Sequence, residues 1–177
     1  RPYTLSLHDA LPISVILPDG FLFGTDNAKV AIKKKLLSDY NLHTVIRMPH
    51  SVFAPYTSIT TNILFFDNTQ PTTETWLYRL DMPDGYKNFS KTKPMKLEHF
   101  APAMEWWDNR TEISADGFDK AKKYTAQEIA DKNYNIDLCG YPHEEEEIFP
   151  NLHHSHPSGT SNGIWSEISV TVSPIFS

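Results

Sequence analysis

A strand, a helix and a second strand follow one another in the first third of the chain. Residues 14–18 form an unbroken apolar run that a Pro-Asp-Gly turn closes, which is typical of a parallel strand buried on both faces. Helix-capping side chains at residues 25–27 precede an expected helix from about Asn27 to Asp39, and residues 43–49 form the next apolar run. This order, with short connections, predicts an α/β sheet with a right-handed crossover.

The expected helix has a narrow apolar stripe and a run of lysines. We interpret the lysines as a solvated outer face and the stripe as the side that lies on the sheet. The stripe repeats every four residues and consists of Ala28, Ile32, Leu36 and Tyr40. The lysines are Lys29, Lys33, Lys34 and Lys35.

Later segments add two strands and two short helices. Residues 59–66 are rich in β-branched and aromatic side chains and follow the preceding strand after a short loop, which predicts an antiparallel pair. Residues 76–80 predict a further strand, and residues 97–100 predict one short helix in the segment 87–111, which is otherwise left unassigned. A Thr-x-x-Glu capping box starts a helix at 126–132.

Composition fits one soluble domain and places the acidity at its end. The 177 residues carry a net charge of -6, but residues 141–177 contain no Lys or Arg and five Glu, so residues 1–140 hold 16 basic against 17 acidic side chains. The uncharged stretch 52–66 is interrupted by Ser, Thr and Asn and is too short and too polar to span a bilayer, so we expect no membrane segment. The single cysteine, Cys139, excludes an internal disulfide and favours a reducing, cytoplasmic location.

The two ends differ from the body in composition. Residues 1–14 resemble translated adapter sequence, and the chain starts with Arg1, so we expect this segment to be non-native. Residues 148–177 contain one charged side chain, Glu167, which predicts a disordered or frameshifted tail. The expected domain therefore spans residues 15–147.

Few residue patterns in the chain indicate enzyme chemistry directly. His153, His154 and His156 follow a run of four glutamates, but neighbouring residues rarely converge on one ion, so we predict no metal site. Cys139 has no basic cluster nearby in the sequence that would activate it as a nucleophile. No Gly-x-Ser-x-Gly, Gly-rich phosphate loop or His-Glu-x-x-His is present, so spacing gives no support to a hydrolase, kinase or metalloprotease.

Two segments lie at the carboxyl ends of expected strands, where open α/β sheets bind their ligands. They are residues 17–20 and residues 48–55. Phe53 lies between prolines in the second segment and has two interpretations. It either anchors the loop in the core or offers an aromatic face to a planar ligand.

Six segments between residues 15 and 142 together indicate a family. The span resembles the C-terminal half of the adenine-N6 methyltransferase domain in the modification subunit of type I restriction-modification systems. The matching segments are VILPDGFLFG at 15–24, LHTVIRMP at 42–49, VFAPYT at 52–57, TNILFF at 61–66, YKNFSKTKP at 86–94 and NYNID at 133–137.

The resemblance implies a fold and a chemistry. The fold is the C-terminal part of a Rossmann-like sheet that is mostly parallel, with an antiparallel strand at 61–66. Such enzymes bind S-adenosylmethionine, flip an adenine out of duplex DNA and methylate its N6 atom. The family's Asn-Pro-Pro-Phe motif and Gly-rich cofactor loop do not occur in this sequence, so we expect them upstream of Arg1 and assign no catalytic residue to this chain.

The resemblance also implies residue roles. Phe53 matches a position that contacts the flipped base, and Pro55 and Thr57 shape the same pocket. Lys91 and Lys93 are candidates for phosphate or base contact, with a solvated basic loop as the alternative interpretation. The expected partners are double-stranded DNA and the specificity and restriction subunits of a type I complex, and residues 133–135 lead to the region that meets the specificity subunit.

A second function class stays open at this point. The chain could be a non-enzymatic module that binds nucleic acid or a partner protein through its sheet and basic loop. Upstream sequence with a Gly-rich strand-turn-helix and Asn-Pro-Pro-Phe would exclude the module. In either case we expect residues 1–177 alone to transfer no methyl group from S-adenosylmethionine to DNA.

Overall fold

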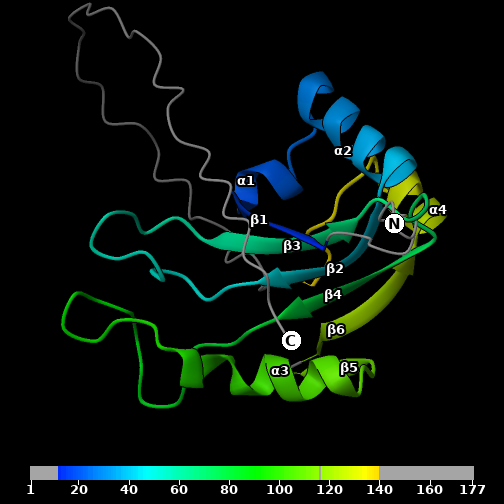
Figure 1. Cartoon of the computed structure of the whole chain (residues 1–177). Helices are drawn as coiled ribbons and strands as arrows, with labels where there is room; N and C mark the ends of the chain where they lie inside the picture. Colours follow the sequence, from blue (N-terminus) through cyan, green and yellow to red (C-terminus); the bar gives the residue numbers. More distant parts are fainter. Residues whose placement is uncertain (1–11, 116, 140–177) are drawn as a thin grey trace, which may run out of the picture.

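The computed structural model describes residues 12–115 and 117–139, which form one mixed sheet with helices on both faces (Figure 1). The strand order in this part of the chain is β1-β3-β2-β4-β6-β5. The strands are β1 Ile13–Pro18, β2 Asn41–Arg47, β3 Thr61–Asp67, β4 Glu74–Arg79, β5 Ile113–Ala115 and β6 Phe118–Thr125. The helices are α1 Asp19–Leu22, α2 Asn27–Asp39, the 3₁₀ turn η1 Leu97–Phe100, α3 Ala101–Asp108 and α4 Ala126–Asp131.

The α/β class is confirmed, but the prediction of a mostly parallel sheet is wrong for the described residues. Only β2 and β4 pair in parallel, while β1 with β3, β2 with β3, β4 with β6 and β5 with β6 pair antiparallel. The connection between β2 and β3 is a loop without a crossover helix, which suits an antiparallel neighbour. The predicted antiparallel pairing of β3 is therefore confirmed.

Strand β1 also differs from its prediction. It lies at one edge of the sheet, is half buried rather than covered on both faces, and pairs antiparallel with β3. Because β2 also pairs antiparallel with β3, β1 and β2 run in the same direction with β3 between them. The expected strand-helix-strand connection thus passes over one intervening strand. The last two residues of the segment 1–14, Ile13 and Ser14, belong to β1, whereas residues 1–11 and 140–177 lie outside the described residues.

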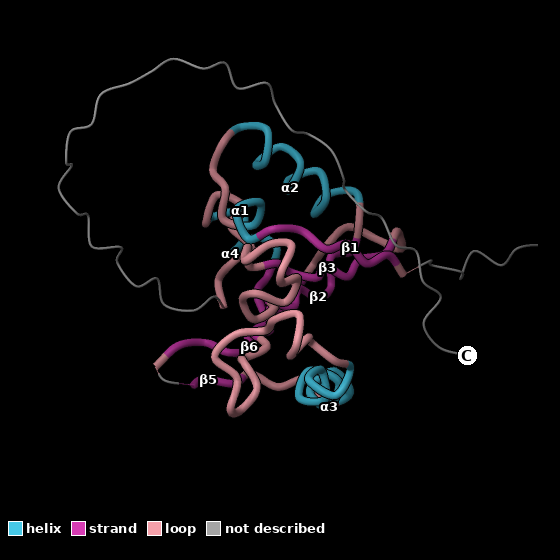
Figure 2. The backbone as a smooth tube through the Cα atoms, turned by 90° about the vertical axis from the view of Figure 1, so that its left-hand side faces the viewer, coloured by secondary structure: helices cyan, strands magenta, loops and turns pink. Residues whose placement is uncertain are grey.

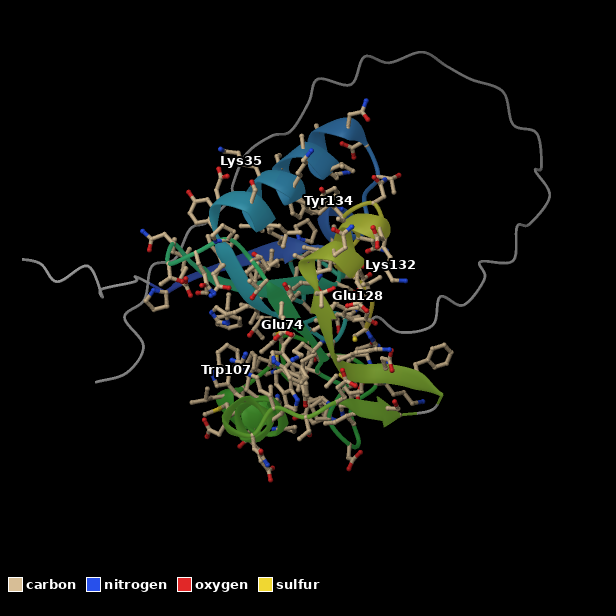
Figure 3. All side chains as sticks on the ribbon, turned by 90° about the vertical axis from the view of Figure 1, so that its right-hand side faces the viewer. Lys35, Glu74, Trp107, Glu128, Lys132 and Tyr134 are labelled. Atoms are coloured by element: carbon tan, nitrogen blue, oxygen red, sulfur yellow. The ribbon has the colours of Figure 1, made fainter. Side chains whose placement is uncertain are left out.

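Two apolar clusters cover the two faces of the sheet. Leu22 of α1, Leu37 of α2 and Ile129 of α4 pack on one face, around Val45 and Leu77 of the central strands. Ala103 and Trp106 of α3 pack on the opposite face. Figure 2 shows α1 and α2 on one side of the sheet and α3 on the other, and Figure 3 shows Trp107 of α3 on one side and Tyr134 on the side of α2. None of the described helices is long and apolar enough to cross a membrane.

Helix α2 begins and ends at the predicted residues. Its N-cap, Asp26, accepts a hydrogen bond from the Lys29 backbone N–H through Oδ1 at 3.0 Å. The predicted buried stripe is wrong in its first half, since Ala28 is exposed and Ile32 is 56% exposed. Its second half is confirmed, because Leu36 packs against the core and Tyr40 meets Phe66 edge to face. The fully buried side chains of the helix are those of Leu37 and Lys33. The face that lies on the sheet is therefore rotated by one residue from the apolar repeat.

Lys33 is the exception to the expected solvated lysine face. Its side chain is buried with 1% of the residue exposed, and Nζ donates to the carbonyl oxygens of Leu22 at 2.9 Å and Gly24 at 2.8 Å. Burial lowers the pKa of the Lys33 ammonium group. These two bonds satisfy carbonyls at and just beyond the C-terminal end of α1, where a helix leaves acceptors without partners.

Replacing Lys33 by Met tests this role. Methionine keeps the aliphatic stem but removes the ammonium donor, so the carbonyls of Leu22 and Gly24 lose their hydrogen bonds from residue 33. We therefore expect the free energy of unfolding to fall by about 1–3 kcal/mol. Urea denaturation measures the change. Lys34→Met on the exposed side of α2 is the control and should change stability by less than about 0.5 kcal/mol. Equal effects of the two variants would contradict the capping role.

The C-terminal third combines confirmed predictions with missed elements. The predicted helix at 97–100 is confirmed as η1, which continues into the unpredicted helix α3. Strand β4 confirms the strand at 76–80 within two residues, and strands β5 and β6 were not predicted. Helix α4 confirms the capping box, because Thr125 Oγ1 accepts from the Glu128 N–H and Glu128 Oε2 accepts from the Thr125 N–H at 2.8 Å.

Candidate nucleic-acid interface

The loop of residues 49–60, here called the aromatic loop, follows the carboxyl end of β2 and leads into β3. Turn hydrogen bonds fix its backbone. The Ala54 N–H donates to the Ser51 carbonyl at 3.0 Å, and the Phe53 carbonyl accepts from the N–H groups of Tyr56 at 2.9 Å and Thr57 at 3.3 Å. Ser51 adopts φ 58, a left-handed conformation that is uncommon outside glycine. The aromatic loop is thus a defined series of turns.

The predicted pocket residues occupy the surface of this loop. Phe53 is 38% exposed and Pro55 is exposed, so part of the Phe53 ring is accessible from solvent. Thr57 is half buried, and its Oγ1 accepts from the Ile59 N–H at 3.1 Å. A partly exposed phenyl ring at the carboxyl end of a strand can stack on a planar ligand. Contact of these residues with a base stays a prediction.

The second loop, residues 82–96, connects β4 to η1 and is here called the lysine loop. It holds four lysines against one acidic residue, Asp84. Lys91 and Lys93 are exposed, and reciprocal backbone hydrogen bonds of 3.0 and 3.1 Å between Ser90 and Lys93 close the turn that presents them. Lys93 Nζ lies 5.5 Å from the ring centre of Tyr86, which packs with Phe89 and His99. An aromatic cluster therefore contacts one of the two predicted lysines, Lys93.

The structure brings the two loops together. His50 Nε2 lies 3.1 Å from the Lys87 carbonyl oxygen and 2.7 Å from Asn88 Oδ1. Ser51 Oγ accepts from the buried Phe89 N–H at 2.9 Å. These contacts span 37 or 38 positions of sequence, and both loops lie at the same end of the sheet (Figure 1). The loop that carries the predicted pocket residues is thus in direct contact with the loop that carries the predicted DNA-binding lysines.

The sequence analysis did not predict an ion-pair network that lies at the carboxyl end of β2. Arg47 ends β2, and its guanidinium contacts Asp137 Oδ1 at 2.5 Å and Asp19 Oδ2 at 3.4 Å. The side chains of Arg47 and Asp137 are only 10% and 4% exposed. Three segments distant in sequence therefore meet at one buried cation. The available signal was an arginine at the end of an otherwise apolar strand, LHTVIR.

A small cavity adjoins the Arg47–Asp137 pair. It is lined by Asn62 and Cys139 in addition to these two residues. Asn62 is fully buried, and neither of its amide heteroatoms has a hydrogen-bond partner among the described residues. Burial raises the pKa of the Cys139 thiol to about 12, so this thiol is a poor nucleophile at neutral pH. The histidines assessed as metal ligands, at 153–156, lie outside the described residues.

Comparisons with known proteins identify the family. The family model for N-6 DNA methylase matches residues 4–148. The methylase subunit of the type I restriction enzyme EcoEI of Escherichia coli is 47% identical over 137 residues, which cover 76% of this chain and 28% of that subunit. The chain thus spans less than a third of the length of this curated relative.

Solved structures support the same assignment. A modification subunit of a putative type I restriction enzyme from Vibrio vulnificus YJ016 matches 67% of this chain and 23% of its own, with 43% identity and a TM-score of 0.59. A chain from work on complex assembly of the type I R-M system matches 74% of this chain and 28% of its own, with 31% identity and a TM-score of 0.63. The resemblance inferred from the six sequence segments is confirmed, and the chain belongs to the N-6 DNA methylase family.

Proposed function

We propose that this chain is part of the modification subunit of a type I restriction-modification system, which methylates the N6 atom of adenine in double-stranded DNA. Family membership supports this assignment over the alternative of a non-enzymatic binding module. The observation that carries the proposal is the joined surface of the aromatic loop and the lysine loop at the carboxyl end of β2. The two loops in contact carry exposed aromatic side chains and an excess of positive charge, respectively.

Each loop would contribute a different part of DNA binding. Phe53 would stack on the displaced adenine, with Pro55 and Thr57 forming the wall of its pocket. Lys91 and Lys93 would hold the neighbouring phosphates, because contacts to phosphate fix the position of the protein on the duplex. Extrusion of the base costs a few kcal/mol of pairing and stacking energy, and stacking on an aromatic side chain returns about 1–3 kcal/mol per base.

The cofactor of this chemistry is S-adenosylmethionine, which supplies the methyl group. The sequence contains neither a Gly-rich loop between a strand and a helix nor an Asn-Pro-Pro-Phe motif. Among the glycines described, Gly24 is closely packed, since a Cβ there would lie 2.7 Å from the Gly20 carbonyl oxygen. The described residues therefore do not fit S-adenosylmethionine, and we assign none of them to cofactor binding. The specificity and restriction subunits would be the protein partners, in the cytoplasm where the DNA lies.

The test places this segment into an active subunit. In a chimera, the 137 matching residues replace their counterpart in the EcoEI methylase subunit, which is assembled with its partner subunits. Phe53→Ala should lower the rate of labelled methyl transfer to duplex DNA at subsaturating DNA about tenfold, from the loss of about 1–3 kcal/mol of stacking. Phe53→Trp retains a stacking face and is the control. A Phe53→Ala chimera with an unchanged rate would exclude the base-contact role, and an inactive parent chimera would count against the assignment of this segment.

A further inference from the structure

A second aromatic side chain stands at the other end of the turn that carries Phe53. Tyr56 is 93% exposed, although tyrosine has a large apolar ring. Within the part of the chain that the structure describes, the Tyr56 side chain has neither a hydrogen bond nor an aromatic partner. Its backbone N–H nevertheless donates to the Phe53 carbonyl at 2.9 Å, so the turn holds both residues in a fixed relation. The exposed ring is therefore presented by an ordered backbone.

The turn is also held from below. Ser51, whose φ of 58 lies in the left-handed region, receives the Phe89 N–H on its side-chain oxygen and the Ala54 N–H on its carbonyl oxygen. Non-glycine residues keep such a conformation only where surrounding contacts determine it. One of these contacts, the Phe89 N–H, comes from the lysine loop, so the turn that carries Tyr56 is attached to the loop that carries the lysines. A rigid aromatic ring loses little conformational entropy when it binds.

The charged residues of the two loops indicate which kind of molecule Tyr56 would bind. The aromatic loop contains no acidic or basic residue other than His50, and the lysine loop has four lysines and one aspartate. Within the described residues, no ion pair joins Lys87, Lys91 or Lys93 to a carboxylate. Exposed aromatic rings beside unpaired lysines are the combination that binds nucleic acid, because the bases stack and the phosphates pair with cations.

We propose that Tyr56 is a second DNA-stacking residue, which stacks on a base flanking the displaced adenine while Phe53 contacts the adenine itself. The proposal deepens the proposed function and rests on it. Phe53 and Tyr56 belong to one turn and are 38% and 93% exposed, so the Tyr56 ring is the more accessible of the two. The hydroxyl of the next residue, Thr57, accepts a hydrogen bond within the loop, whereas the Tyr56 side chain is exposed.

The experiment measures DNA binding by the 177-residue chain with fluorescence anisotropy. The probe is a fluorescein-labelled 14-base-pair duplex with one adenine opposite an abasic site, because an unpaired base costs least to displace. Tyr56→Ala should weaken binding about tenfold and leave the salt dependence unchanged, while Tyr56→Phe should bind like the parent chain. Phe118→Ala, which removes another exposed aromatic ring in the β5–β6 hairpin, is the matched control and should have no effect.

Other outcomes separate this inference from the proposed function. The double variant Lys91→Gln/Lys93→Gln should lower the slope of log affinity against log salt by about two, as expected for two lost phosphate contacts. If this slope falls while Tyr56→Ala binds like the parent, the DNA interface stands and the role of Tyr56 is excluded. If neither the lysine variant nor Tyr56→Ala changes binding, the interface itself fails. Loss of affinity for the specificity subunit alone in Tyr56→Ala would assign the ring to a protein contact and overturn the inference.

Discussion

Replacing Arg47 by Met should lower the free energy of unfolding by about 3–5 kcal/mol, because Asp137 then stays buried without its cation. The guanidinium lies 2.5 Å from Asp137 and 3.4 Å from Asp19, and the Asp137 side chain is 4% exposed. An unpaired carboxylate in such a place cannot recover its hydration. Urea denaturation of the 177-residue chain, followed by circular dichroism, measures the change.

A double-variant cycle separates this ion pair from simple loss of packing. Arg47→Met with Asp137→Leu removes both charges and should recover much of the stability that Arg47→Met loses, since apolar replacements of buried pairs are often neutral. Arg110→Met is the control. Arg110 lies 4.2 Å from the ring centre of Trp107 and pairs with no described carboxylate, so this change should cost about 1 kcal/mol or less. A double variant as unstable as Arg47→Met would contradict the ion-pair explanation.

Local signals explain which elements could be predicted from the sequence. Helix α2 and the capping box of α4 depend on side chains within four residues of the backbone groups that they cap, and both were predicted with nearly correct bounds. The antiparallel pairing of β2 and β3 follows from the length of the loop between them. Such features need no knowledge of the rest of the molecule.

Long-range packing explains the errors. Lys33 is buried because the carbonyls of Leu22 and Gly24 lie within reach of its ammonium group, and no apolar repeat in α2 contains that information. The sheet was expected to be mostly parallel because the family resemblance implied a Rossmann-like sheet, and the described residues include only one parallel pair. Strands β5 and β6 were missed because the segment 87–111 and the residues after it show weak periodicity.

In the candidate site, too, the separate residues could be predicted from local sequence, whereas the contacts between distant segments could not. Phe53 was proposed from the segment 52–57, and Lys91 and Lys93 were proposed together from the segment 86–94. The contact between the two loops depends on a hydrogen bond between His50 and Asn88 and on one that Ser51 Oγ accepts from the Phe89 N–H. Each pair is 38 positions apart, and a single sequence gives no sign of such pairs. The Arg47–Asp137 contact spans 90 positions and was missed for the same reason.

The packing of helix α3 against the sheet should depend mainly on the side chain of Trp106. Trp106 is buried, stacks on Tyr78 with ring centres 4.5 Å apart, and meets Trp76 edge to face at 5.7 Å. Its Nε1–H donates to the Thr111 carbonyl at 2.9 Å. Trp106→Ala removes these contacts, leaves a cavity and deprives the carbonyl of its donor, so we expect the free energy of unfolding to fall by about 3–5 kcal/mol in urea denaturation.

Two further variants and one local measurement make this prediction specific. Trp106→Phe keeps a ring against Tyr78 and should cost less than the alanine variant, whereas Met104→Ala, on the exposed side of α3, should change stability by less than about 0.5 kcal/mol. Because α3 follows the lysine loop, its loosening should also speed hydrogen exchange at the Phe89 N–H, the group that binds Ser51. A loss of global stability with unchanged relative protection of Phe89 would show that α3 stabilises the sheet without holding the two loops together.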